Sequence, residues 1–226
     1  GSRGVEAVLK AMRKLRDIPS VQARGCATIA NMSRNPSYVR SLSLSQNLNC
    51  GKTVTTKTKH RFRRAIVKAR GVEEVVRAMR SHMDSADVQR QGCRAIRNVA
   101  MDSEFVGTIA RAGGISCVVK AMQDFEDDES VQSRSIWTLR SLASESTLVK
   151  RQVADQGGIE SIVIAMLKFR KSADVQVQGC GALASLSANC VENEKAIVKA
   201  GGLDAVCTAM RMHVGSEEVQ AAGCTA

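Results

Sequence analysis

The chain contains eight cysteines and three histidines, the side chains with the greatest capacity for metal binding, disulfide formation and nucleophilic catalysis. No Cys-x-x-Cys pair occurs among them. Packed helices lie roughly 10 Å apart, which is too far for a disulfide between equivalent positions of neighbouring helices. We therefore expect small, reduced core thiols, with no metal and no cofactor. Four of the cysteines directly follow a glycine: Cys26, Cys93, Cys180 and Cys224.

The other candidate reactive groups are isolated in the sequence. Cys50 and Cys190 lie outside the repeated positions and remain candidates for reactive thiols. His82 and His213 each stand three residues after an Ala-Met pair, so a repeating structure holds them apart. The tripeptide Gly-Lys-Thr at 51–53 copies the end of a phosphate-binding loop but lacks the earlier glycine and a preceding strand. We predict no enzyme activity and no small-molecule substrate.

An internal repeat sets the positions of these residues. Five Val-Gln pairs recur in register, and the last four of these are 43, 44 and 44 residues apart. Each pair begins nine residues after the Met of an Ala-Met pair, which in turn follows a glycine turn. Three markers that keep one period indicate a solenoid, whose units complete their cores against their neighbours. The glutamines of the pairs are Gln22, Gln89, Gln132, Gln176 and Gln220.

The apolar residues between these markers predict helices. After Gly202 they recur at i, i+3, i+4 and i+7, and the same spacing follows Val175. A shorter run, Glu192 to Ala200, predicts another helix before them. No run alternates like a half-buried strand, so the predicted fold is all-α. Serine precedes three of the predicted third helices as an N-cap: Ser85, Ser172 and Ser216.

Three helices per unit, a glycine corner and a period near 43 resemble the armadillo repeat. The stretches 65–71 (Ala-Ile-Val-Lys-Ala-Arg-Gly) and 196–202 (Ala-Ile-Val-Lys-Ala-Gly-Gly) carry the short first helix and corner that HEAT repeats usually lack. The stretch 88–100 is similar to the family's long third helix and contains its Ile-Arg-Asn pattern. The resemblance implies a right-handed armadillo solenoid of about five repeats, a single domain over residues 1–226, that binds partners rather than catalysing a reaction.

The resemblance also implies a concave groove, lined by the third helices, for an extended peptide. Its predicted floor consists of the positions i, i+3 and i+7 on the helix face opposite the core. In peptide-binding members an asparagine at the last position hydrogen-bonds the ligand backbone. Asn31 and Asn98 match that asparagine, whereas Ser141 and Ser185 do not. The other predicted floor residues are Arg24, Ala27, Gln91, Arg94, Arg134, Trp137, Gln178 and Gly181.

The position four residues before that asparagine bears on the class of ligand. Importin-α-like members carry a tryptophan there that holds lysine stems. This chain has Ala27, Arg94, Trp137 and Gly181 instead, which disfavours recognition of a nuclear targeting signal. Trp137 is a binding hot spot if it is exposed and a packing residue if a neighbouring helix covers it. The sequence leaves both interpretations open.

The positive charge of the predicted groove indicates the chemical class of its partner. Arg24, Arg94 and Arg134 lie on the floor, Arg97 and Arg140 lie at its edge, and no acidic residue stands at the aligned positions. This arrangement, similar to β-catenin-like grooves, favours a partner with carboxylates. We therefore predict a non-catalytic scaffold that binds an extended acidic peptide of a protein partner.

The first third of the chain supports an alternative function. The formal net charge is +11, and residues 1–70 carry 16 Lys/Arg against 2 Asp/Glu. A spacing of 67 residues between the first two Val-Gln pairs places an insertion at 38–60, for which we predict a basic loop. With Arg61, Arg63 and Arg64 the loop forms a tract suited to nucleic acid or an anionic surface. A decoration without function and a retained intron give the same pattern.

The sequence gives weaker indications of location and extent. It has no run of 18 apolar residues and no charged-then-apolar leader, so we predict neither a membrane span nor a secretory signal. Reduced thiols favour the cytoplasm, extending to the nucleus. Because the chain opens at a corner glycine and ends about one turn into a third helix, we expect it to be a piece of a longer array.

Overall fold

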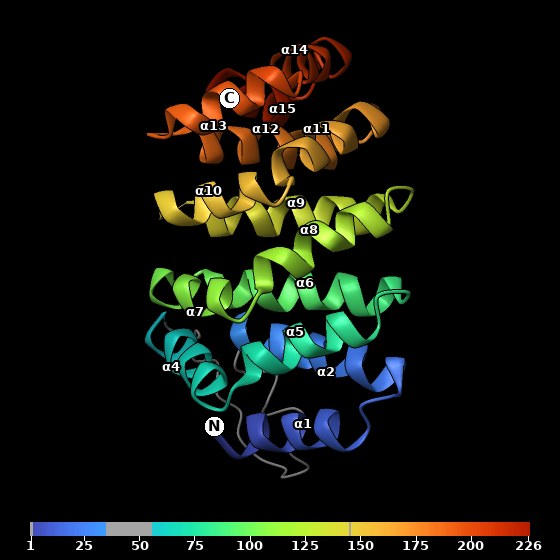
Figure 1. Cartoon of the computed structure of the whole chain (residues 1–226), viewed down its shortest axis with the longest axis vertical. Coiled ribbons are helices and arrows are strands. Elements are labelled where there is room, and N and C mark those ends of the chain that lie inside the picture. Colours follow the sequence, from blue (N-terminus) through green and yellow to red (C-terminus); the bar gives the residue numbers. More distant parts are fainter. Residues whose placement is uncertain (1, 35–55, 145) are drawn as a thin grey trace. The chain divides into compact units, whose positions relative to one another are not determined.

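A computed structural model describes residues 2–34, 56–144 and 146–226. Within these ranges the chain forms α-helices and one short 3-10 helix, and no strand, as predicted. The contacts divide the chain into two compact units, Gly1–Ala112 (unit 1) and Gly113–Ala226 (unit 2). Figure 1 shows helices stacked within each unit. The predicted single domain over residues 1–226 remains a prediction.

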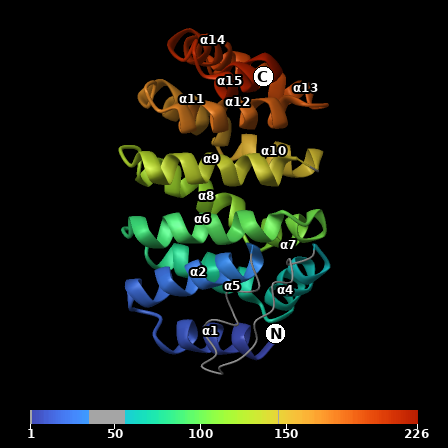
Figure 2. The same ribbon diagram turned by 180° about the vertical axis from the view of Figure 1, so that it is seen from behind.

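Unit 1 contains the helices of the first two repeats and the short helices that follow them. The third helices α2 and α6 of these repeats lie side by side (Figure 2). The elements are α1 (Ser2–Lys14), α2 (Pro19–Arg34), α4 (Thr56–Lys68), α5 (Gly71–Ser81), α6 (Ala86–Ala100), η1 (Ser103–Phe105) and α7 (Val106–Arg111).

Unit 2 has the same organisation. Its third helices are α9, α12 and α15; α9 packs against α12, and α12 packs against α15 (Figure 2). The elements are α8 (Gly114–Asp124), α9 (Glu129–Ala143), α10 (Thr147–Asp155), α11 (Gly158–Lys168), α12 (Ala173–Ser187), α13 (Val191–Lys199), α14 (Gly202–Met212) and α15 (Glu217–Thr225).

The repeated glutamine closes the end of each second helix. The Nε2 atom of Gln89 donates to the carbonyl oxygens of Met79 at 2.9 Å and His82 at 2.8 Å, at the end of α5. The last carbonyls of a helix have no partner within the helix, so one amide satisfies two of them. The glutamines of the other four repeats make the same pair of bonds, and they are Gln22, Gln132, Gln176 and Gln220.

The corners between first and second helices need a left-handed backbone. Gly113, Gly157 and Gly201 take φ values of 84°, 78° and 81° at this position. Arg70 occupies the same position before α5 with φ 60° and ψ 36°. Glycine adopts this conformation without a steric cost, whereas a residue with a Cβ does not. Arg70 is therefore a strained corner.

The predicted caps of the third helices are confirmed. The side chain of Ser85 accepts a hydrogen bond from the Val88 amide, and Ser172 and Ser216 do the same in their repeats. Asp128 fills this role for α9 at 2.9 Å. These bonds fix where each third helix begins, and so which residues face outward along it.

The cysteine of the repeated Gly-Cys pair packs in the core in all but the last of the repeats that carry it. Cys26, Cys93 and Cys180 are fully buried, as predicted. Burial raises the pKa of Cys26 to about 12 and that of Cys180 to about 11, from an ordinary 9.0. Cys224, in the last repeat, is exposed, so the prediction of a core thiol is wrong for this residue. The thiols of the enclosed repeats are therefore packing groups rather than nucleophiles.

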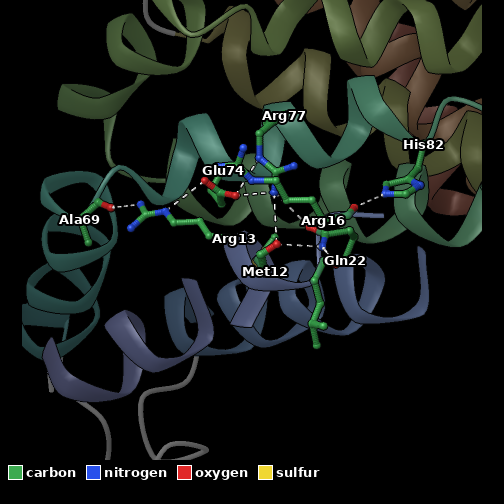
Figure 3. A network of polar contacts seen from close by, with 9 residues as sticks. Met12, Arg13, Arg16, Gln22, Ala69, Glu74, Arg77 and His82 are labelled. Carbon is green, nitrogen blue, oxygen red and sulfur yellow. Dashed lines mark hydrogen bonds and ion pairs between the residues drawn. The ribbon is translucent and has the colours of Figure 1, made fainter. Parts of the chain in front are cut away.

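A buried carboxylate joins the first two repeats. Glu74 of α5 pairs with Arg77 of the same helix, and its Oε2 atom lies 3.3 Å from the Nε atom of Arg13 in α1 (Figure 3). The Nη2 atom of Arg77 also donates to the carbonyl oxygen of Met12 and to the Oε1 atom of Gln22, both at 3.4 Å. The charge of Glu74 is thus matched within the protein, which an enclosed carboxylate requires.

The predicted loop at 38–60 is wrong for its last five residues. Helix α4 begins at Thr56, so residues 56–60 are helical. His60 explains this start, because its Nδ1 atom lies 2.9 Å from Asp102 and its ring stacks on Phe105 at 5.9 Å between centroids. Both partners are about forty positions later in the sequence, where local periodicity carries no information. Residues 38–55 of the predicted loop lie outside the described residues.

Candidate peptide-binding surface

The predicted floor is divided between the two units. Unit 1 contributes Arg24 and Asn31 on α2, and Gln91, Arg94 and Asn98 on α6. Arg24 is exposed, and Asn31, Gln91 and Arg94 are half-buried. The Nη2 atom of Arg94 donates to the Oδ1 atom of Asn31 at 2.5 Å, and its Nη1 atom lies 3.4 Å from the Oε1 atom of Gln91. Arg94 therefore bridges the two third helices of unit 1.

Asn98 does not lie on an exposed floor, and the prediction of its exposure is wrong. The side chain is 0% exposed. Its Nδ2 atom donates to the carbonyl oxygen of Ala30 at 2.8 Å, and its Oδ1 atom accepts from Arg97 Nη2 at 2.8 Å. Both ends of the amide thus bind groups of this chain. In this arrangement Asn98 holds α6 to α2 instead of presenting its amide to a ligand.

In unit 2 the exposed surface centres on Trp137 of α9. The residue is 42% exposed, so of the two interpretations that the sequence left open the structure supports an exposed Trp137. Arg134 stands one turn earlier on the same face and is half-buried. Its Nε atom is buried and has no hydrogen-bond acceptor within the described part of the chain. An aromatic surface therefore adjoins a guanidinium with unused donor capacity.

The other floor residues of unit 2 are less available than predicted. Gln178 of α12 is 9% exposed, and its Oε1 atom lies 3.4 Å from the Nη1 atom of Arg140. Arg140, placed at the groove edge by sequence, thus crosses from α9 to α12. Ser141 donates to the carbonyl oxygen of Trp137 at 2.9 Å, and Ser185 to that of Gly181 at 2.8 Å. Both hydroxyls donate their hydrogen bond to a carbonyl of their own helix, so toward a ligand they act as acceptors only.

Sequence reasoning named Arg140 but missed its role as a bridge between helices. The available signal was Gly181, which stands where the repeat carries a tryptophan in importin-α-like proteins. A missing side chain on one third helix leaves room for a long side chain from its neighbour. Arg94, at the repeat position of Trp137, also reaches a neighbouring third helix in unit 1, toward Asn31 of the preceding repeat.

The basic tract of unit 1 is partly neutralised. Arg63 is buried, and its Nη1 atom lies 2.7 Å from Asp102. His60 and Arg64 both lie near Glu104, at 3.3 and 3.4 Å. These residues fasten α4 to the segment after α6, and Arg64 remains exposed beside its acidic partner. Arg61 is exposed.

The remaining chemical candidates occupy structural positions. Cys190 is 2% exposed, so the interpretation of Cys190 as a reactive thiol is wrong, and Cys50 lies outside the described residues. The Nε2 atoms of His82 and His213 contact the carbonyl oxygens of Arg16 and Arg170 in the preceding repeats. Across the described ranges no three His, Cys, Asp or Glu side chains are grouped to hold a metal ion.

No single helix among the described residues is long and apolar enough to cross a membrane. One bent pair, Ser103–Arg111 with Gly114–Asp124, passes the test of length and composition jointly.

Comparison with known proteins gives a result for the structure and none for the sequence. The chain matches no protein-family model and no curated protein. An engineered protein, target OR329 of the Northeast Structural Genomics Consortium, is 25% identical, with a TM-score of 0.69 and coverage of 98% of this chain and 94% of that chain. A designed armadillo repeat protein in complex with the peptide (KR)4 is 18% identical, with a TM-score of 0.67 over 98% of this chain and 97% of that chain.

A natural protein shows the same likeness. A structure concerned with the interaction between cadherin and beta-catenin is 16% identical, with a TM-score of 0.65 over 97% of this chain and 43% of that chain. The three-helix repeats, the left-handed corners and these likenesses agree. The chain is an all-α solenoid of armadillo-like repeats.

Proposed function

We propose that this chain is a non-catalytic protein-interaction scaffold that binds an extended acidic segment on the exposed faces of its third helices. The observation that carries the proposal is the surface of α9, where the exposed ring of Trp137 adjoins the half-buried guanidinium of Arg134. The likeness to designed proteins for modular peptide recognition supports the general class.

Trp137 supplies the apolar part of the proposed contact. A tryptophan ring offers a large area that loses little rotamer freedom on binding, and such residues dominate many interfaces. Trp137 is 42% exposed, so part of its surface is open to a ligand. An apolar side chain of the ligand would cover the ring and remove both surfaces from water.

Arg134 supplies the charge. A half-buried guanidinium is less screened by solvent than a fully exposed one, so its attraction for a carboxylate is stronger. Its buried Nε donor lacks an acceptor, and leaving such a donor unsatisfied costs about 1–3 kcal/mol. A ligand carboxylate can accept from the outer Nη donors of this half-buried guanidinium while the Nε atom stays enclosed, so the charge favours acidic over basic segments.

Selection from a displayed library of random peptides, about twelve residues long, tests the proposal. The chain should enrich acidic peptides, and Arg134→Glu should weaken the best of them at least about tenfold, or 1.4 kcal/mol. Trp137→Ala should cost about 2 kcal/mol of binding free energy. Arg211→Glu is the matched control, because Arg211 is exposed on the second helix α14 of the same unit, and it should leave affinity unchanged.

Two outcomes would contradict the proposal. One is enrichment of basic peptides, or of none. The other is an affinity that survives Arg134→Glu and Trp137→Ala and is lost when residues 38–64 are deleted. That second result, together with a steep loss of affinity for generic DNA as salt rises, would assign binding to the basic tract instead.

A further inference from the structure

Gly181 lies inside α12 at a place where the backbone does not require glycine. In the described residues the glycines with positive φ are Gly113, Gly157 and Gly201, all at corners. Gly181 is helical, and a glycine within a helix destabilises it by roughly 0.5–1 kcal/mol relative to alanine. The helix carries this cost without a conformational reason, so the reason lies in what surrounds the glycine.

The guanidinium of Arg140 occupies the space above Gly181. A Cβ atom at Gly181 would lie 2.5 Å from the Cζ atom of Arg140, 2.6 Å from its Nη1 atom and 2.7 Å from its Nε atom. These distances are far below van der Waals contact, so the guanidinium rests directly on the α12 backbone. The missing side chain therefore forms a seat for Arg140.

The neighbouring Gly179 has a different reason to be glycine. A Cβ atom there would lie 2.5 Å from the Cγ atom of Met166, whose side chain is fully buried and has no room to move. Arg140 is half-buried, and its long side chain meets the added atom only with its flexible end, so it can swing away. Gly179 thus serves the core, whereas Gly181 only determines where a charged group lies.

Arg140 on this seat is directed at a ligand. Within the described ranges its side chain makes one hydrogen bond, a long one of 3.4 Å to Gln178, and pairs with no carboxylate. Arg140 follows Trp137 by three residues, so the two share a helix face about 5–6 Å apart at Cβ. Alternate side chains of an extended peptide repeat at roughly 6.6–6.8 Å on one face, which is close to this spacing.

We infer that Gly181 positions Arg140 as a carboxylate receptor beside Trp137, so that the preferred ligand carries an acidic residue two positions from a large apolar residue. The guanidinium donates to the carboxylate, and the indole packs on the apolar side chain. This inference rests on the proposed function and adds a ligand pattern and a positioning residue to it.

Gly181→Ala is the test, because stability and binding should move in opposite directions. The alanine should raise the thermal midpoint by about 2–4 °C and weaken the peptide best enriched by the unmodified chain at least about tenfold. Gly179→Ala, the matched control two residues away, should lower the midpoint. Arg140→Gln should weaken binding as much as Gly181→Ala, and the double variant should be no weaker than either, since both changes remove one contact.

The ligand pattern gives an independent readout. Replacing the acidic residue of that peptide by its amide should abolish the difference between the unmodified chain and Gly181→Ala. A peptide whose affinity depends on Trp137 and Arg134 but is indifferent to Gly181→Ala and Arg140→Gln would overturn this inference and leave the proposed function standing. Indifference to Trp137 and Arg134 as well would overturn both.

Discussion

The glutamine at the end of each second helix makes a quantitative prediction about stability. Gln89 is buried, and its amide donates to two carbonyl oxygens at 2.9 and 2.8 Å. Gln220 makes the same two bonds at 2.8 and 3.0 Å but is half-buried. The two residues therefore share bonding geometry and differ in access to water, which allows burial to be separated from bond length.

Replacement by methionine removes the donors while keeping the volume. At Gln89 it eliminates two hydrogen bonds of about 1 kcal/mol each and leaves the enclosed Met79 carbonyl without its donor, whereas the His82 carbonyl keeps the Ser85 amide at 3.2 Å; we expect a loss of about 2–4 kcal/mol. At Gln220 water can reach the equivalent carbonyls, those of Met210 and His213, so the loss of free energy of unfolding should stay below about 1 kcal/mol. An interaction energy set by distance alone would give equal losses at the two sites.

Urea denaturation followed by circular dichroism measures both variants, with the free energy of unfolding extrapolated to zero denaturant. If Gln89→Met has a much lower free energy of unfolding than Gln220→Met, and the two variants depend on urea concentration with similar slopes, the glutamine is supported as a cap of buried carbonyls. Equal losses, or a neutral Gln89→Met, would refute it. Gln89→Glu adds a check, because a carboxylate facing two carbonyls is repelled and should destabilise at least as much as methionine.

The corner and the thiols give two further predictions. Arg70→Gly should raise the free energy of unfolding by about 0.5–1 kcal/mol, because glycine relieves a left-handed residue; Gly157→Arg at the equivalent corner should lower it, and chemical denaturation measures both. Stability should fall as pH rises above 9, since burial raises the pKa of Cys26 to about 12 and of Cys180 to about 11, so the unfolded chain loses these protons first. The free energy of unfolding should fall by about 1.4 kcal/mol per pH unit for each thiol, and this slope should flatten when Cys26 and Cys180 are both replaced by alanine. An unchanged slope in that variant would show that other groups cause the loss of stability.

The features that could be predicted from the sequence are those fixed by local chemistry. Ser85 was identified as a cap because a serine before an apolar run has few other roles. Burial of Cys93 followed from its repeated place after a glycine. Each needs only the residue, its neighbours and the period. Arg70 shows the limit, since the corner was recognised from its glycine but the strained position is the arginine beside it.

The site was harder to predict because it depends on side chains that cross between helices. Asn98 satisfies the family's pattern, yet its amide binds Ala30 and Arg97. Arg140 is long enough to leave its own helix and reach Gln178 of the next third helix. The residue that a long side chain contacts on the neighbouring helix lies some forty positions away in the sequence. Periodicity therefore found the face but not which of its residues remain exposed.

The single tryptophan of the chain allows the most direct test of the proposed function. Trp137 is the only fluorophore of its kind and lies at the proposed contact. Titration with the best acidic peptide from the library should shift its emission to shorter wavelength and protect it from acrylamide, with the same midpoint as an independent binding curve. Saturable binding of that peptide with no change in the emission or the quenching of Trp137 would contradict the account.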